Sequence, residues 1–162
     1  MKVNLYSVVE LIKLARPHLV KAKGEIVNVS SIAGQPTAFA TLPYYAISKT
    51  ALDQMMRAVA INLIGEGVRV NSVSPGAVIT DFMQNMGVPA EMFEKQMGSF
   101  TKIPGALPCG KVAVPSDIAS IIAFLADRSQ SWYIVGQTIV ADGGTSIVLA
   151  LNATPNMVKQ LE

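Results

Sequence analysis

Glu25-Ile26-Val27-Asn28-Val29-Ser30 is the stretch that decides the fold. It is short, rich in β-branched residues and bounded by turn residues, so it predicts a buried β-strand. Upstream of it, apolar residues recur every three or four positions between Val3 and about Val20, which is typical of an amphipathic helix. Pro17 lies inside this pattern and is expected to disturb the last turn of that helix.

A second helix is predicted downstream of the strand. Its apolar face is formed by Ala51, Leu52, Met55, Met56, Val59 and Leu63. Gly65-Glu66-Gly67 is expected to end it. Val68–Val73 then predicts another strand, which Ser74-Pro75-Gly76 ends.

The last third of the chain repeats this alternation. A helix is expected to start at Pro115-Ser116-Asp117, with Ser116 as its N-cap, and to run to about Ala126. Gly136–Ala141 predicts a final strand, closed by Asp142-Gly143-Gly144. Because helices alternate with strands, we expect an α/β fold with a parallel, doubly wound sheet in a single domain, 1–162.

The segment from about 80 to 115 has weak periodicity and is the kind of insertion that often acts as a substrate lid. Its methionine and phenylalanine side chains favour an apolar substrate, because flexible Met side chains adapt to varied apolar shapes. Ordinary core packing is the alternative. These residues are Phe82, Met83, Met86, Met92, Phe93, Met97 and Phe100.

Bulk composition excludes several classes of protein. The formal charge is +2 and the Lys and Arg residues are scattered, which argues against a nucleic-acid partner. Cys109 is the single cysteine and His18 the single histidine, so we expect neither a disulfide nor a metal site. No apolar run is long enough for a membrane span and no secretory signal is evident, so a cytoplasmic protein is expected.

Tyr45-Ala46-Ile47-Ser48-Lys49 carries the chemistry. A phenol and an ammonium four residues apart project from one face of a helix. A cation beside a phenol favours the phenolate, so Lys49 is expected to lower the pKa of Tyr45 toward the range of a general acid or base. Ser31 precedes Tyr45 at the carboxyl end of a predicted strand, where ligands bind in open α/β sheets. A surface lysine beside a core tyrosine is the alternative.

Four motifs in this order resemble those of the classical short-chain dehydrogenase/reductases. They are Asn28-Val29-Ser30-Ser31-Ile32-Ala33-Gly34, Tyr45-Ala46-Ile47-Ser48-Lys49, Asn71-Ser72-Val73-Ser74-Pro75-Gly76 and Asp142-Gly143-Gly144. The resemblance implies a Rossmann-like fold and an NAD- or NADP-dependent oxidoreductase that interconverts hydroxyl and carbonyl groups on a small-molecule substrate.

The resemblance also implies roles for individual residues. Ser31 would bind the oxygen of the substrate, Tyr45 would exchange the proton, and Lys49 would lower the pKa of the phenol and bind the nicotinamide ribose. Asn4, in Val3-Asn4-Leu5, resembles the family asparagine that helps to hold a proton-relay water.

Pro75-Gly76-Ala77-Val78-Ile79-Thr80 resembles the family segment that meets the nicotinamide. There the backbone at Val78 and the hydroxyl of Thr80 would contact the carboxamide, after the turn made by Pro75 and Gly76. A plain turn that ends a strand is the alternative.

A glycine-rich turn after a strand, which would cradle the pyrophosphate, does not occur in these 162 residues. Gly65-Glu66-Gly67 follows a helix instead. We therefore expect a partial Rossmann-like sheet, that is, a fragment or truncated form that starts at an interior methionine, leaves an unpaired edge on the strand at 26–30, and is inactive alone. The alternative is a non-catalytic form that pairs with full-length relatives, or with itself as a homo-oligomer, through the helices at 3–20 and 44–64.

Overall fold

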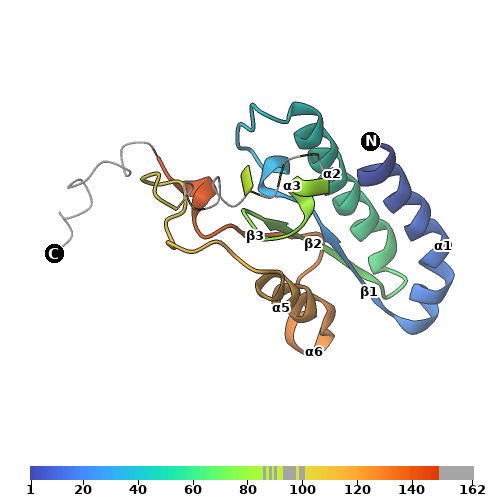
Figure 1. Ribbon diagram of the computed structural model, residues 1–162. Coiled ribbons are helices and arrows are strands. Elements are labelled where there is room, and N and C mark those ends of the chain that lie inside the picture. The colour runs from blue at the N-terminus through green and yellow to red at the C-terminus, as the bar shows by residue number, and fades with distance from the viewer. Residues whose placement is uncertain (86, 88, 90, 93–97, 99–100, 150–162) are drawn as a thin grey trace.

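A three-stranded parallel sheet forms the centre of the molecule (Figure 1). The computed structural model describes residues 1–85, 87, 89, 91–92, 98 and 101–149. The strands are β1 (Glu25–Val29), β2 (Arg69–Pro75) and β3 (Thr138–Ala141), in the order β1-β2-β3. Both strand pairs are parallel, so the three predicted strands and their direction are confirmed.

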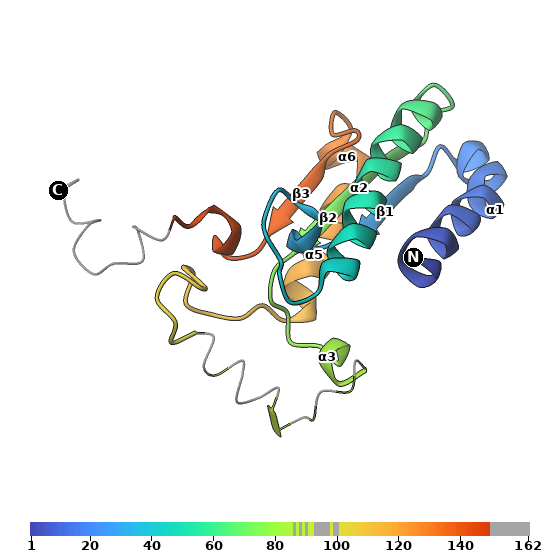
Figure 2. The same cartoon turned by 90° about the horizontal axis from the view of Figure 1, so that it is seen from above.

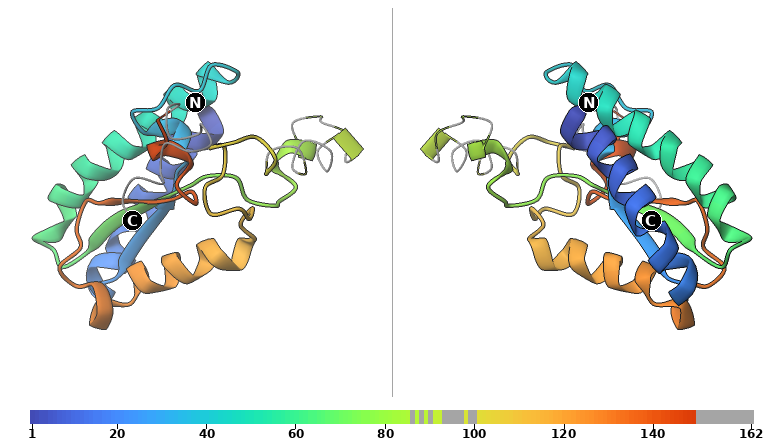
Figure 3. Two further views of the ribbon diagram at one scale, coloured as in Figure 1. Left: turned by 90° about the vertical axis from the view of Figure 1, so that its left-hand side faces the viewer. Right: turned by 90° about the vertical axis from the view of Figure 1, so that its right-hand side faces the viewer.

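Helices cover both faces of the sheet. A π-helical turn (Lys2–Tyr6) leads into α1 (Ser7–Ala22), which runs beside α2 (Pro43–Ile64), as Figure 2 shows from above. In Figure 3, α5 (Pro115–Ala126) lies on the opposite side of the sheet from α2. This arrangement confirms the doubly wound α/β fold.

Short helical segments complete the described structure. They are the 3-10 turn Ile32–Gly34, α3 (Phe82–Asn85), α6 (Arg128–Ser131) and the 3-10 turn Thr145–Ile147. The segment expected to be a lid contains α3. Four of its apolar residues, Met86, Phe93, Met97 and Phe100, lie outside the described residues, as does the side chain of Met83.

The last turn of α1 is intact, so the expectation that Pro17 would disturb it is wrong. Two features close this end of the helix. Lys23 adopts a left-handed conformation with φ 49°, and the Gly24 amide donates a hydrogen bond of 2.9 Å to the carbonyl of Leu19. A bond of this span is that of a Schellman motif, which satisfies carbonyls that the helix leaves without partners.

The start of α5 also differs from the prediction. Val114 is the N-cap residue and Pro115 is the first helical residue, so the expected cap at Ser116 is wrong. The Asp117 carboxylate reaches back and accepts a hydrogen bond of 2.8 Å from the Val114 amide. Proline fits the first helical position because it has no amide to satisfy there, and this shifts the start of the helix by two residues.

The core lies between α2 and the sheet. Its central cluster consists of Met56, Ala60, Leu63, Val68 and Val70. β1 contributes less than predicted, because Asn28 is its only buried residue and Val29 is 48% exposed. Within the described residues β1 pairs only with β2, so its other edge is unpaired there, and the prediction of a buried strand is wrong.

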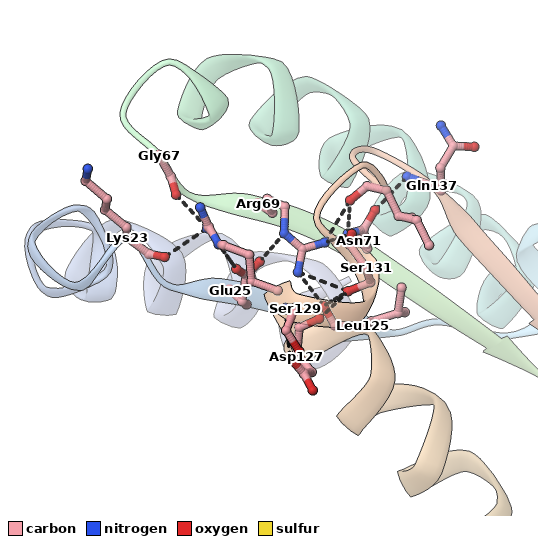
Figure 4. Close-up of polar contacts among 12 residues, drawn as sticks. Lys23, Glu25, Gly67, Arg69, Asn71, Leu125, Asp127, Ser129, Ser131 and Gln137 are labelled. Carbon is pink, nitrogen blue, oxygen red and sulfur yellow. Dashed lines mark hydrogen bonds and ion pairs between the residues drawn. The ribbon is translucent and has the colours of Figure 1, made fainter.

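A buried charge network connects the amino-terminal ends of β1 and β2 to α5 and α6 (Figure 4). The Arg69 guanidinium, only 1% exposed, forms an ion pair of 2.8 Å with Glu25. It also donates to the backbone carbonyls of Leu125, Ser131 and Ile134. These contacts hold the start of β1 and the end of α5 in one place, at the opposite end of the strands from the site described next.

Candidate active site

Ser31 lies where β1 ends and the chain turns toward α2. Its backbone is extended and it caps the 3-10 turn Ile32–Gly34, with its Oγ accepting a hydrogen bond of 3.1 Å from the Ala33 amide. The side chain is half-buried. This is the carboxyl edge of a parallel sheet, where open α/β folds bind their ligands.

Tyr45 and Lys49 occupy the first turns of α2, which begins at Pro43. The Lys49 Nζ lies 5.7 Å from the centroid of the Tyr45 ring and donates a hydrogen bond of 2.9 Å to the carbonyl of Val29. That carbonyl is close in sequence to Ser31. The structure therefore brings Ser31, Tyr45 and Lys49 together at the carboxyl end of β1.

Burial governs the acid–base properties of this group. It raises the pKa of Tyr45, and a hydrogen bond with the Ser31 side chain lowers it by a smaller amount. The net direction is upward, which corrects the expectation that Lys49 would lower the pKa of the phenol. The geometry gives the reason, since the Lys49 ammonium lies over the ring and is bound to the Val29 carbonyl.

Lys49 is affected by the same burial. Loss of solvent lowers the pKa of its ammonium, and the negative charge of Asp53 opposes this. A half-buried lysine with a nearby carboxylate is a cation whose charge depends on that partner.

Asn4 lies in the π-helical turn at the start of the chain. Its side-chain amide donates a hydrogen bond of 3.1 Å to Ser48 Oγ, and Ser48 Oγ donates one of 2.7 Å to the carbonyl of Tyr45. Asn4 therefore reaches α2 between the tyrosine and the lysine. The contact goes to Ser48, a residue for which the sequence analysis proposed no role.

The segment after β2 approaches the same place. The Gly76 amide donates a hydrogen bond of 3.0 Å to the Ala141 carbonyl, and a Cβ on Gly76 would lie 2.8 Å from Asp142 Cβ, so only glycine fits there. Pro75 is the last residue of β2, and Val78 forms a bridge with Ala113.

Thr80 extends this segment toward the tyrosine. Its exposed side chain accepts a hydrogen bond of 3.4 Å from the Phe82 amide. The Phe82 ring lies 5.5 Å from the Tyr45 ring. The cofactor-binding candidates Pro75, Gly76, Val78 and Thr80 thus lead directly to the phenol.

These residues fit one end of a nicotinamide dinucleotide. Among the described residues, the Lys49 ammonium donates to the Val29 carbonyl with one N–H group, and its other N–H groups could bind a ribose hydroxyl. The pyrophosphate end has no counterpart there. Among the described residues, none of the turns that follow β1, β2 and β3 is a glycine-rich loop that leads into a long helix.

Among the described residues, no group of three His, Cys, Asp or Glu side chains could hold a metal ion. No described helix is long and apolar enough to cross a bilayer. Cys109 is exposed, and its Sγ donates a hydrogen bond of 3.2 Å to the Lys111 carbonyl.

Sequence reasoning missed Asp53 and Gln35. The Asp53 carboxylate is 1% exposed and accepts a hydrogen bond of 2.7 Å from the Gln35 side chain. A signal was available, because Asp53 falls one helical turn after Lys49, next to Leu52 on the apolar face of the predicted helix. An acidic side chain on that face requires compensating partners in the fold.

Comparisons with known proteins agree with this geometry. The sequence profile of a family described as enoyl-(acyl carrier protein) reductase matches residues 1–146. A meso-2,3-butanediol dehydrogenase from Serratia marcescens is 38% identical over 144 residues, which is 89% of this chain and 53% of that protein. The chain thus spans about half the length of the curated relatives it matches.

Solved structures give the same result. The crystal structure of a short-chain dehydrogenase/reductase of unknown function from Caenorhabditis elegans, with cofactor, superposes with a TM-score of 0.91 at 51% identity, covering 94% of this chain and 56% of that one. A glucose dehydrogenase of Caenorhabditis elegans in the apo form gives a TM-score of 0.76 at 47% identity, covering 90% and 55%. On the fold, the clustered motifs and these matches, the chain belongs to the short-chain dehydrogenase/reductase family.

Proposed function

We propose that this chain carries the proton-transferring half of an NAD- or NADP-dependent oxidoreductase that interconverts a hydroxyl and a carbonyl group on a small molecule. One observation carries the proposal. The side chains of Ser31 and Tyr45 are within hydrogen-bonding reach of each other, and the Lys49 ammonium lies over the Tyr45 ring. Two hydroxyls and a cation at the carboxyl edge of a parallel sheet can bind and protonate one oxygen atom.

In the direction of reduction, Ser31 would hold the carbonyl oxygen of the substrate by a hydrogen bond. Tyr45 would donate its phenolic proton to that oxygen as the carbonyl carbon receives a hydride. A bound nicotinamide dinucleotide would supply the hydride. Lys49, whose ammonium lies over the ring of Tyr45, would contribute by binding the nicotinamide ribose rather than by lowering the pKa of the phenol.

The cofactor-binding part of the proposal uses the same segments. Tyr45 and Lys49 would hold the nicotinamide ribose, and the Val78 backbone with the Thr80 hydroxyl would hold the carboxamide, after the turn at Pro75 and Gly76. Phe82 supports a lid over 80–115, since its ring already packs against Tyr45. An apolar ring at this place favours a substrate that is apolar beside its reacting oxygen.

We also propose that the 162-residue chain shows no turnover by itself. The charge-assisted bonds of a pyrophosphate are worth about 1.5 to 3 kcal/mol each, so several absent ones leave cofactor affinity very weak. The test compares the chain with a chimaera in which residues 1–146 replace the matching part of the cofactor-bound Caenorhabditis elegans relative. Absorbance at 340 nm is followed with NADH or NADPH and a panel of ketones and aldehydes.

We expect no turnover from the chain alone and turnover from the chimaera, which Tyr45→Phe abolishes. Tyr44→Phe is the matched control, because Tyr44 is 86% exposed and is expected to have no effect. A chimaera that binds NADPH but whose turnover is indifferent to Tyr45→Phe would refute the function. Tyr45-dependent turnover by the chain alone would refute only its inactivity.

A second candidate function is association through α1 and α2. No residue of α1 is buried, and large apolar side chains of both helices are exposed to solvent. They include Leu11 at 66%, Leu14 at 73%, Ile47 at 55% and Ile61 at 76%. Light scattering behind size-exclusion chromatography is expected to give at least a dimer of this chain, or a complex with a full-length relative. A monomer that ignores such a relative would exclude this function.

A further inference from the structure

Asp53 is a buried carboxylate that the proposed reaction does not use. Its side chain is 1% exposed, and it lies in α2 one turn after Lys49. Its Oδ2 accepts a hydrogen bond of 2.7 Å from the Gln35 amide nitrogen. Burial raises the pKa of Asp53, and hydrogen bonds with Ser30 and Gln35 and the charges of Arg57 and Lys49 oppose this by a smaller amount. Its Oδ1 has no hydrogen-bond partner among the described residues. A buried carboxylate is expensive unless its charge is compensated nearby.

The contacts of Asp53 run to the strand ends that carry the site. The same Gln35 nitrogen that binds Asp53 also donates a hydrogen bond of 3.2 Å to Ser74 Oγ, near the end of β2. Ser30 Oγ donates one of 3.4 Å to the Lys49 carbonyl. Ser30 precedes Ser31, and Gln35 follows the 3-10 turn that Ser31 caps. These bonds therefore hold the turn that carries Ser31 against α2, the helix that carries Lys49.

Gly34 shows how closely this turn sits on α2. A Cβ on Gly34 would lie 2.8 Å from the backbone carbonyl carbon of Lys49 and 3.0 Å from Asp53 Oδ2. Contacts under 3.0 Å do not occur for real Cβ atoms, so any larger residue would force the turn away from the helix. The Asp53 carboxylate is therefore part of a tightly packed junction directly behind the proposed site.

The charges that act on Asp53 are both cations of its own helix, Lys49 and Arg57. The turn after β1 and the end of β2 face it with the neutral hydrogen-bonding groups of Ser30, Gln35 and Ser74. Arg57 is exposed and donates a hydrogen bond of 3.3 Å to Gln54. Lys49 is the half-buried one of the two, and burial lowers its pKa while Asp53 raises it.

We propose that Asp53 is a positioning residue of this site: its carboxylate keeps the Lys49 ammonium charged and, through Gln35, holds the Ser31 turn against α2. This role rests on the proposed function only in treating Ser31, Tyr45 and Lys49 as the reacting groups. Lys49, which is half-buried and bound to the Val29 carbonyl, then has an anion one turn away on the same helix.

The test measures the pKa of Lys49 directly, by a pH titration of lysine labelled with 13C at Cε, with the Lys49 signal assigned from Lys49→Arg. Asp53→Asn keeps the size and the hydrogen-bonding oxygen of the side chain but removes its charge. We expect the pKa of Lys49 to fall by about 1, as for loss of an opposite charge nearby. Glu66→Gln is the matched control, since it removes a carboxylate that pairs with Arg16 instead, and the Lys49 titration should not move.

A role in folding alone would lower the stability of Asp53→Asn and leave the Lys49 titration unchanged, and that result would overturn the proposal. If Asp53→Asn does not fold, the unaltered protein decides, by titration of its Asp53 carboxyl carbon. An ionised Asp53 at neutral pH supports the proposal, and a protonated one overturns it. Neither measurement needs turnover, so failure of the proposed function in the absorbance assay leaves this result standing.

Discussion

Arg69→Met offers a quantitative test of the buried charge network. The substitution keeps a long apolar side chain but removes the guanidinium that pairs with Glu25. Two of the three carbonyls that Arg69 contacts keep a donor of their own, since Ile134 accepts from the Asn71 side chain and Ser131 accepts from the Ile134 amide. The Leu125 carbonyl shares the single proton of the Ser131 hydroxyl with the Asp127 carbonyl. The main loss is therefore the partner of a Glu25 carboxylate that is only 11% exposed.

Breaking a buried ion pair at one end is worth roughly 3 to 5 kcal/mol. Glu25 still has Arg128, at 2.8 Å, so we expect the lower end, a loss of about 3 kcal/mol. For a urea m-value of about 2 kcal/mol/M, the unfolding midpoint then falls by about 1.5 M. Fluorescence of Trp132, the only tryptophan, reports the transition beside Ser131, and far-UV circular dichroism gives a second probe.

The controls separate charge from packing. Arg16→Met breaks an exposed pair with Glu66, so its loss should stay below about 1 kcal/mol. Adding Glu25→Gln to Arg69→Met removes the carboxylate that has lost one of its two cationic partners, and this should recover part of the lost free energy of unfolding. A loss of less than about 1 kcal/mol from Arg69→Met, or no recovery in the double variant, would refute the reasoning.

Three further outcomes follow from local geometry. Gly76→Ala places a Cβ 2.8 Å from Asp142 Cβ and should lose about 1 to 3 kcal/mol in urea unfolding, whereas Gly65→Ala, with open space around it, should lose nothing. Asp117→Ala removes the carboxylate that caps α5 and should cost about 1 kcal/mol, which is excluded if the midpoint does not move. Burial raises the pKa of Asp142, but hydrogen bonds from Ser146 and Gly144 lower it more, to below its ordinary value. Its contribution to stability is therefore present above the unfolded pKa of about 3.9 and lost as the pH falls, so acid unfolding of Asp142→Asn should depend less steeply on pH below about 4.

The positions of the strands and of α2 were predictable because each has a clear local sequence pattern. β-branched runs predicted β1, β2 and β3, and the spacing of Leu52, Met56 and Leu63 predicted the buried face of α2. The cap of α5 was misplaced by two residues, because Ser116 has the chemistry of a cap but Pro115 has the backbone angle of a first helical residue. Local composition could not decide between these two signals.

Tertiary partners explain the remaining differences. An unpaired edge on this strand was expected, but a run of β-branched residues gives no sign of which side chains a neighbour covers, so the 48% exposure of Val29 did not follow from the sequence. Lys49 was expected to act on the phenol oxygen, but the Val29 carbonyl holds its ammonium over the ring. Asp53, Gln35 and Ser74 come from three separate segments, and only the fold shows that they meet.

The central claim is that Ser31, Tyr45 and Lys49 act as one proton-transfer group, and titration of Tyr45 tests it most directly. The protein is labelled with 13C at tyrosine Cζ, the Tyr45 signal is assigned from Tyr45→Phe, and its pKa is measured in Ser31→Ala and in Lys49→Met. The account predicts that Ser31→Ala raises the pKa of Tyr45, because it removes a hydrogen bond that favours the phenolate. Lys49→Met is expected to change this pKa less, because the Lys49 ammonium is bound to the Val29 carbonyl and lies over the ring. A Tyr45 titration that is the same in all three proteins would contradict it.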